Sequence, residues 1–113
     1  MPWNARLETS PSSGITTCWA ANGEANIIRI DDAIPYFYPG SPHGLYPGSF
    51  GYATIEGETF SGKGEIRIDP RFRAALMSGK TMQFSYAPWP SGVSIERSTS
   101  LRGIERARAC LGN

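Results

Sequence analysis

The chain has 113 residues, of which 40% are hydrophobic and 19% are charged, and its formal net charge is +1. A chain of this length builds one domain around one modest core. The near-neutral charge excludes the basic field of a nucleic-acid-binding protein, and no run of about eighteen apolar residues is present to span a bilayer. We therefore expect no nucleic-acid partner and no membrane span.

The chain opens on a polar segment. Residues 1–14 are predicted to be a flexible lead-in, and residues 15–113 a single β-rich domain. Thirteen glycines and nine prolines favour short strands joined by frequent turns over long helices.

The first predicted elements are two strands, 16–21 and 25–30. Asn22 and Gly23 lie between them and are typical of a tight hairpin turn. The stretch 31–49 is then interrupted repeatedly by proline, which predicts a long loop rich in aromatic residues. Such a loop is either a packed cover for the core or a recognition surface.

Further strands and two helices follow this loop. A short helix is expected after Asp69, a good N-cap, with Pro70 at its first position and Gly79 at its end. Apolar residues at helical spacing near the end of the chain predict a C-terminal helix. The strands expected in this part are 50–55, 65–68, 81–86 and 93–97.

Together these elements predict a mainly β fold. We expect an antiparallel β-sandwich or curled sheet of six or seven strands, with a short mid-chain helix and a C-terminal helix.

The two cysteines, Cys18 and Cys110, lie near opposite ends of the chain. With no C-x-x-C pair and no histidine cluster, no metal site is expected. We favour a disulfide, because it would tie an N-terminal strand to the C-terminal helix, and two buried free thiols are the alternative. A disulfide indicates an oxidising compartment, so we expect a periplasmic or secreted protein whose signal peptide has been removed.

The sequence offers few candidates for catalytic residues. The single histidine, His43, has no Gly-x-Ser-x-Gly nucleophile beside it and is interpreted as an exposed loop residue. Glu56, Glu58 and Glu65 could converge as a glycosidase-type carboxylate pair, although acidic residues beside glycines more often belong to turns. We therefore expect no enzyme activity, no catalytic residue and no cofactor.

The candidate partner-binding residues are aromatic and basic. Tyr and Trp suit recognition because they bury much area with few rotatable bonds. The aromatic side chains could equally roof the core, and the two arginines, one helical turn apart, could belong to a solvated helix face. The candidates are Tyr36, Phe37, Tyr38, Tyr46, Trp89, Arg102 and Arg106.

The segment Ser100 to Ala107 reads Ser-Leu-Arg-Gly-Ile-Glu-Arg-Ala and follows a Gly79 turn and a predicted hairpin. This arrangement, over roughly residues 64–111, resembles the end of the invasion-associated locus B family of bacterial envelope proteins. The resemblance implies a periplasmic or secreted β-sandwich with no known catalytic site, linked to bacterial surface or host interaction.

We therefore expect a periplasmic or secreted bacterial binding protein that acts by protein–protein contact. One alternative is an inhibitor or immunity protein that plugs a target enzyme with its aromatic, proline-rich loop. The other alternative is a small carboxylate-dependent hydrolase.

Overall fold

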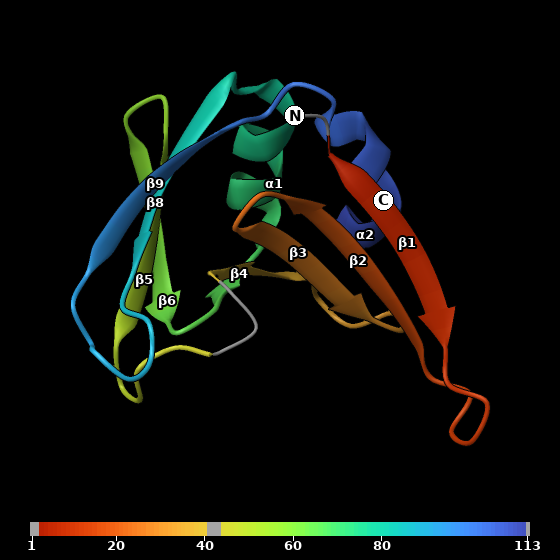
Figure 1. Cartoon of the computed structure of the whole chain (residues 1–113). Helices are drawn as coiled ribbons and strands as arrows, with labels where there is room; N and C mark the ends of the chain where they lie inside the picture. The colour runs from red at the N-terminus through yellow and green to blue at the C-terminus, as the bar shows by residue number, and fades with distance from the viewer. Residues whose placement is uncertain (1–2, 41–43, 113) are drawn as a thin grey trace.

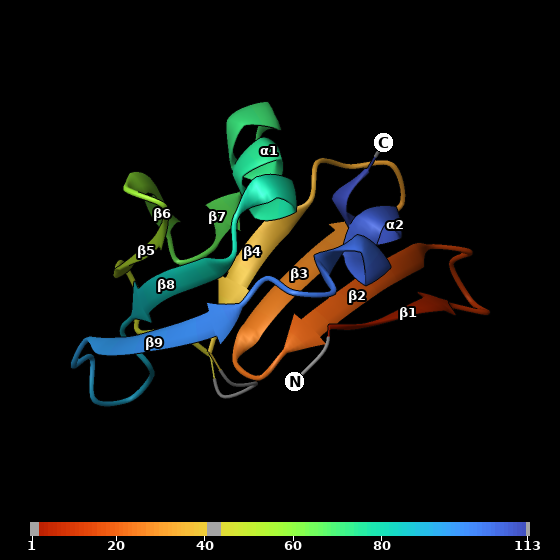
Figure 2. The same cartoon turned by 90° about the horizontal axis from the view of Figure 1, so that it is seen from above.

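The computed structural model describes residues 3–40 and 44–112. The fold is mainly β, as predicted, with two antiparallel sheets in a sandwich-like arrangement and α1 between them in both views (Figures 1 and 2). The strands are β1 (Asn4–Thr9), β2 (Thr16–Asn22), β3 (Ala25–Ile30), β4 (Tyr36–Pro39), β5 (Phe50–Ile55), β6 (Glu58–Lys63), β7 (Ile66–Arg67), β8 (Thr81–Tyr86) and β9 (Ile95–Ser100). The helices are α1 (Pro70–Ser78), the 3₁₀ helix η1 (Ile104–Ala107) and α2 (Arg108–Leu111).

The larger sheet has the strand order β1-β2-β3-β4-β7. Its β2–β3 hairpin confirms the predicted tight turn, shifted by one residue, because Asn22 pairs with Ala25 and the turn is Gly23 and Glu24. Gly23 has φ +63°, which a residue without Cβ adopts readily.

Two strands of this sheet lie where loops were predicted. Residues 4–9, placed in the flexible lead-in, form β1, which pairs with β2 along its whole length. All six β1 residues are exposed, so no alternation of buried side chains marks the strand in the sequence. Residues 36–39, placed in the long loop, form β4 between Pro35 and Gly40, since a four-residue strand tolerates prolines at its ends.

The smaller sheet has the order β6-β5-β8-β9. The strands predicted at 50–55 and 81–86 are confirmed with the same bounds. The last strand begins two residues later than predicted, at Ile95. β6 was not predicted, because the Gly62 in its sequence resembles a turn residue.

Both predicted helices are present. The Asp69 carboxylate accepts a hydrogen bond from the Phe72 backbone N–H at 2.9 Å, which caps α1 as expected. The C-terminal helix is divided into η1 and α2, because the chain after Leu101 first winds in i→i+3 turns such as Ile104 N–H to Leu101 C=O.

The core fills the space between the sheets and α1. Phe37 of β4 meets Phe84 of β8 edge-to-face, with ring centroids 5.4 Å apart, and Phe60 of β6 stacks on Phe72 of α1 at 4.5 Å. These contacts between all three layers place the centre of the core at Phe37, which is fully buried.

The predicted disulfide is also present. Cys18 of β2 is bonded to Cys110 of α2, with Cα atoms 5.2 Å apart and a sequence separation of 92. The bond therefore joins the start of the larger sheet to the end of the chain. None of the helices in the described residues has the length and apolar character needed to cross a bilayer.

Candidate functional site

The aromatic residues predicted as a binding loop separate into different parts of the fold. Phe37 is fully buried in the core, so its place among the partner-binding residues is wrong. Tyr36 and Tyr38 are half-buried on the outer face of the larger sheet. Strand alternation explains this division, because neighbours along β4 point to opposite faces. Burial, and then the nearby Glu65, raise the pKa of Tyr36.

Tyr46 and Trp89 do come together. Their rings stack with centroids 5.8 Å apart and an interplanar angle of 28°. Two loops carry them, and backbone hydrogen bonds tie the loops together, from Tyr46 N–H to Ala87 C=O at 2.8 Å and from Trp89 N–H to Gly44 C=O at 3.2 Å. The pair is therefore held in place by the backbone as well as by ring contact.

A second stacked pair, which the sequence-based prediction missed, lies at the start of β5. The Phe50 and Tyr52 rings lie on the outer face of the smaller sheet, with centroids 6.5 Å apart. The buried residues of β5 are Gly51, Ala53 and Ile55, so the two residues that alternate with the rings on the buried face are very small. This inverted pattern, with large rings alternating with very small residues, is the sequence signal that could have identified the pair.

These two pairs form what we call the aromatic surface. Its rings are each between 43% and 53% exposed, and they lie at the end of the smaller sheet where β8 leads into the 87–94 loop. Beside Tyr52, polar residues of β8 and β9, including Gln83 and Glu96, line a shallow hollow. The aromatic surface consists of Tyr46, Phe50, Tyr52 and Trp89.

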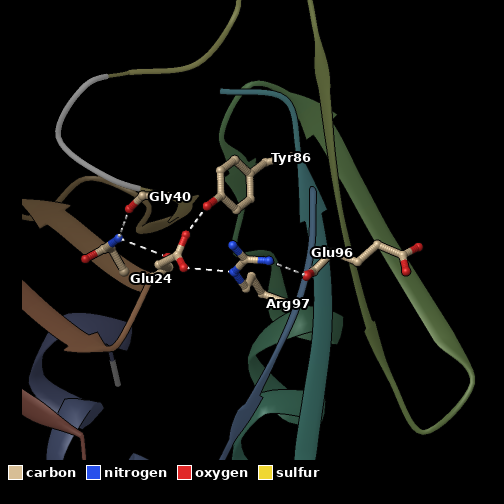
Figure 3. A network of polar contacts seen from close by, with 6 residues as sticks. Glu24, Gly40, Tyr86, Glu96 and Arg97 are labelled. Atoms are coloured by element: carbon tan, nitrogen blue, oxygen red, sulfur yellow. Dashed lines mark hydrogen bonds and ion pairs between the residues drawn. The ribbon is translucent and has the colours of Figure 1, made fainter. Parts of the chain in front are cut away.

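A polar network joins the two sheets close to this end (Figure 3). Glu24, on the β2–β3 turn, accepts a hydrogen bond from the Tyr86 hydroxyl and one from the Arg97 guanidinium at 2.9 Å. Asn26 donates from its side-chain amide to the backbone oxygens of Glu24 and Gly40, at 3.2 and 3.1 Å. We call Glu24, Tyr86 and Arg97 the inter-sheet clamp.

The contacts within the clamp shift the pKa values of Glu24 and Tyr86. The hydrogen bond from Tyr86, followed by that from Arg97, lowers the pKa of the Glu24 carboxyl. Burial, followed by the hydrogen bond to Glu24, raises the pKa of Tyr86 to about 12. Near neutral pH the clamp is thus a carboxylate between a neutral phenol and a cation, which stabilises the contact between the sheets.

The two candidate arginines lie away from the aromatic surface. β9 runs from the 87–94 loop to Ser100, and Arg102 and Arg106 follow beyond its far end. Both are exposed, and Arg106 lies within η1 while Arg102 precedes it. They therefore do not extend the aromatic surface.

Of the three carboxylates considered for hydrolysis, Glu56 and Glu58 line one hollow beside α1, but Glu65 does not join them. Glu58 begins β6 and is paired with Arg71, whereas Glu65 lies past the other end of that strand. Glu56 is exposed in the β5–β6 turn. No group of three metal-binding side chains occurs within residues 3–40 and 44–112. His43 lies outside the described residues.

Comparison with known proteins adds no assignment. The chain matches no protein-family model, and neither a curated protein nor a solved structure is detectably similar to it.

Proposed function

We propose that this chain is a periplasmic or secreted bacterial protein that binds a protein partner through the aromatic surface, without a cofactor. The observation that carries the proposal is the exposure of four large rings, in two stacked pairs, at one end of a sheet. Clustered exposed aromatics are typical of binding sites, where Tyr and Trp contribute a large share of the binding energy.

Rigidity supports the same function. The Tyr46 and Trp89 loops are bonded to each other, and Phe50 and Tyr52 project from a paired strand. A surface that is ordered before binding loses little conformational entropy when the partner arrives. Loops placed on a rigid scaffold in this way commonly carry recognition.

The location is supported by the disulfide, because such bonds persist in oxidising compartments. The resemblance of residues 64–111 to the invasion-associated locus B family agrees with this location, and membership of that family is part of the proposal. In this chain the resembling segment includes the β8–β9 hairpin and Cys110, one partner of the disulfide.

The proposal is tested by truncating one ring at a time. The immobilised protein is exposed to an envelope fraction of the producing bacterium, and the retained proteins are identified by mass spectrometry. We expect Tyr46→Ala and Trp89→Ala to lose a retained protein that the unaltered chain and the matched variant Ile34→Ala both keep. Ile34 is an equally exposed apolar residue on a different loop.

Thermal unfolding of the same variants separates binding from folding. Truncation of an exposed ring changes stability by only about 0.5 kcal/mol, so the melting temperatures should stay close together. If Tyr46→Ala and Trp89→Ala mainly unfold the protein, the rings cover the core and the binding proposal is wrong.

A second candidate is an inhibitor or immunity protein whose tethered loops enter the cleft of a target enzyme. The hydrogen bonds between the 44–49 and 87–94 loops favour this candidate, since a pre-ordered loop suits tight inhibition. A wall-degrading muramidase is the probe. Inhibition that Trp89→Ala removes would support this candidate, and full muramidase activity in excess protein would count against it.

A further inference from the structure

One edge of the larger sheet is the six-residue strand β1. β1 runs along the outside of the molecule (Figure 2), and every one of its residues is exposed. Its start is anchored, because Trp3 is buried and its indole N–H donates to the Ser100 carbonyl at 3.0 Å. An ordered strand whose outer edge is unpaired is a template for pairing with another chain.

The ladder between β1 and β2 shows which backbone groups are free. The Ser10 N–H donates to the Ile15 carbonyl at 2.9 Å, and hydrogen-bonded pairs alternate along an antiparallel ladder. The even-numbered residues of β1 therefore bond to β2. The odd-numbered residues turn their N–H and C=O groups outward, with no hydrogen-bond partner among the described residues. They are Ala5, Leu7 and Thr9.

The charged side chains of β1 are complementary to those of a second, antiparallel copy of the strand. Arg6 and Glu8 lie on either side of Leu7, on the same face, with their charged atoms 3.2 Å apart. An antiparallel copy of the strand, centred on Leu7, places Arg6 opposite the partner's Glu8 and Glu8 opposite the partner's Arg6. These are non-hydrogen-bonded pairs, in which cross-strand side chains approach most closely.

The same register satisfies the outward backbone groups. Leu7 pairs with the partner's Leu7, and Ala5 pairs with the partner's Thr9, so each outward N–H meets a carbonyl. Leu7 is 66% exposed in the single chain and would be covered by its counterpart. Two of the other edge strands suit pairing less well, because β7 has only two residues and the Ser100 carbonyl of β9 already accepts from Trp3 and Asn22.

We propose that β1 pairs antiparallel with β1 of a second copy, centred on Leu7, so that two larger sheets join across a two-fold axis. The contact is isologous, as expected for a symmetric dimer. One strand pair forms a small interface, so the dimer dissociates readily on dilution.

Sedimentation velocity tests the proposal over concentrations from about 10 μM to about 1 mM, where small interfaces associate. Arg6→Glu alone and Glu8→Arg alone each place like charges opposite each other in both pairs. Each should raise the dissociation constant about tenfold. The double variant Arg6→Glu with Glu8→Arg restores opposite charges and should return the constant close to its original value. Lys63→Glu, on the other sheet, controls for net charge and should change little.

Amide hydrogen exchange of the unaltered chain provides the second readout. Protection of Ala5, Leu7 and Thr9 should rise with protein concentration, while their even-numbered neighbours, already bonded to β2, change little. A monomer at every concentration overturns the proposal. So does a dimer that the two single variants leave intact, or one that forms without protecting these three amides.

Discussion

Glu24 is joined to residues that come much later in the chain. Its carboxylate meets Tyr86 and Arg97, which are 62 and 73 residues away in sequence. No local pattern around Glu24 indicates either partner, because the contact depends on the packing of one sheet against the other. The clamp could therefore not be predicted from the sequence, although Gly23 beside it could be placed in a turn.

The first prediction concerns the ionisation of Tyr86. Its pKa is raised from 10.0 to about 12, so the folded state keeps the phenol proton where the unfolded chain has lost it. Stability from this group is therefore complete below about pH 10 and is lost as the pH rises towards about 12. A tyrosinate absorbance titration should show a late step near pH 12 that Tyr86→Phe removes.

Glu24→Gln is the control for that titration. It removes a charge that disfavours ionisation but leaves the ring buried, so the late step should move to lower pH and remain. A titration of Tyr86→Phe that matches the unaltered chain would show that another tyrosine is responsible.

The sequence predicted the surface position of some aromatic candidates correctly and of others incorrectly. Tyr46 and Trp89 were predicted to be candidates for one surface, and the structure stacks them. Phe37 was placed with them because its neighbours are also aromatic. Phe37 is buried because of the face of β4 on which it lies, and the three residues between Pro35 and Pro39 are too few to show from the sequence which face that is.

At the scale of elements, β2, β3, β5 and β8 could be predicted because turn residues or alternating apolar side chains mark them. β1 and β6 could not be predicted, because each forms a strand through its pairing with a neighbour, β2 or β5, and not through a pattern in its own sequence. An exposed edge strand needs no apolar alternation, and its sequence is indistinguishable from that of a polar loop.

The second prediction concerns the end of β4. Gly40 has φ +103°, and a Cβ built there would lie 2.9 Å from the ring of Tyr86, which Glu24 holds in place. Gly40→Ala should therefore lower the free energy of unfolding by about 2–3 kcal/mol, through backbone strain and steric overlap together. Urea denaturation measures this difference.

Gly48→Ala is the matched variant. Gly48 also has a positive φ, of +80°, but a Cβ added at this glycine would meet no atom within 4 Å. Only the backbone strain applies, so the loss should be about 1 kcal/mol. Equal losses in the two variants would mean that the Tyr86 contact contributes nothing to the cost.

At the scale of the whole molecule, the disulfide closes a loop of 92 residues between β2 and α2. In the chain-entropy model a loop of this length stabilises the folded state by roughly 4–5 kcal/mol. That is a large share of the stability of a small domain. This long-range bond could be predicted, because the chain has only two cysteines.

The third prediction is that Cys18→Ala with Cys110→Ala lowers the free energy of unfolding by about 3–5 kcal/mol in urea denaturation. Mass spectrometry of the unaltered protein, denatured and alkylated without reductant, provides the control and should show an unmodified monomer. Two added alkyl groups would mean free thiols and would remove the argument for an oxidising compartment.

Photo-crosslinking within the producing organism tests whether the aromatic surface binds a protein partner. A photoreactive aromatic amino acid replaces Trp89 in one variant and Ile34 in another, both exposed apolar positions. We expect a discrete covalent adduct with one protein from position 89 and none from position 34. No adduct from position 89, or the same adducts from both positions, would contradict the claim.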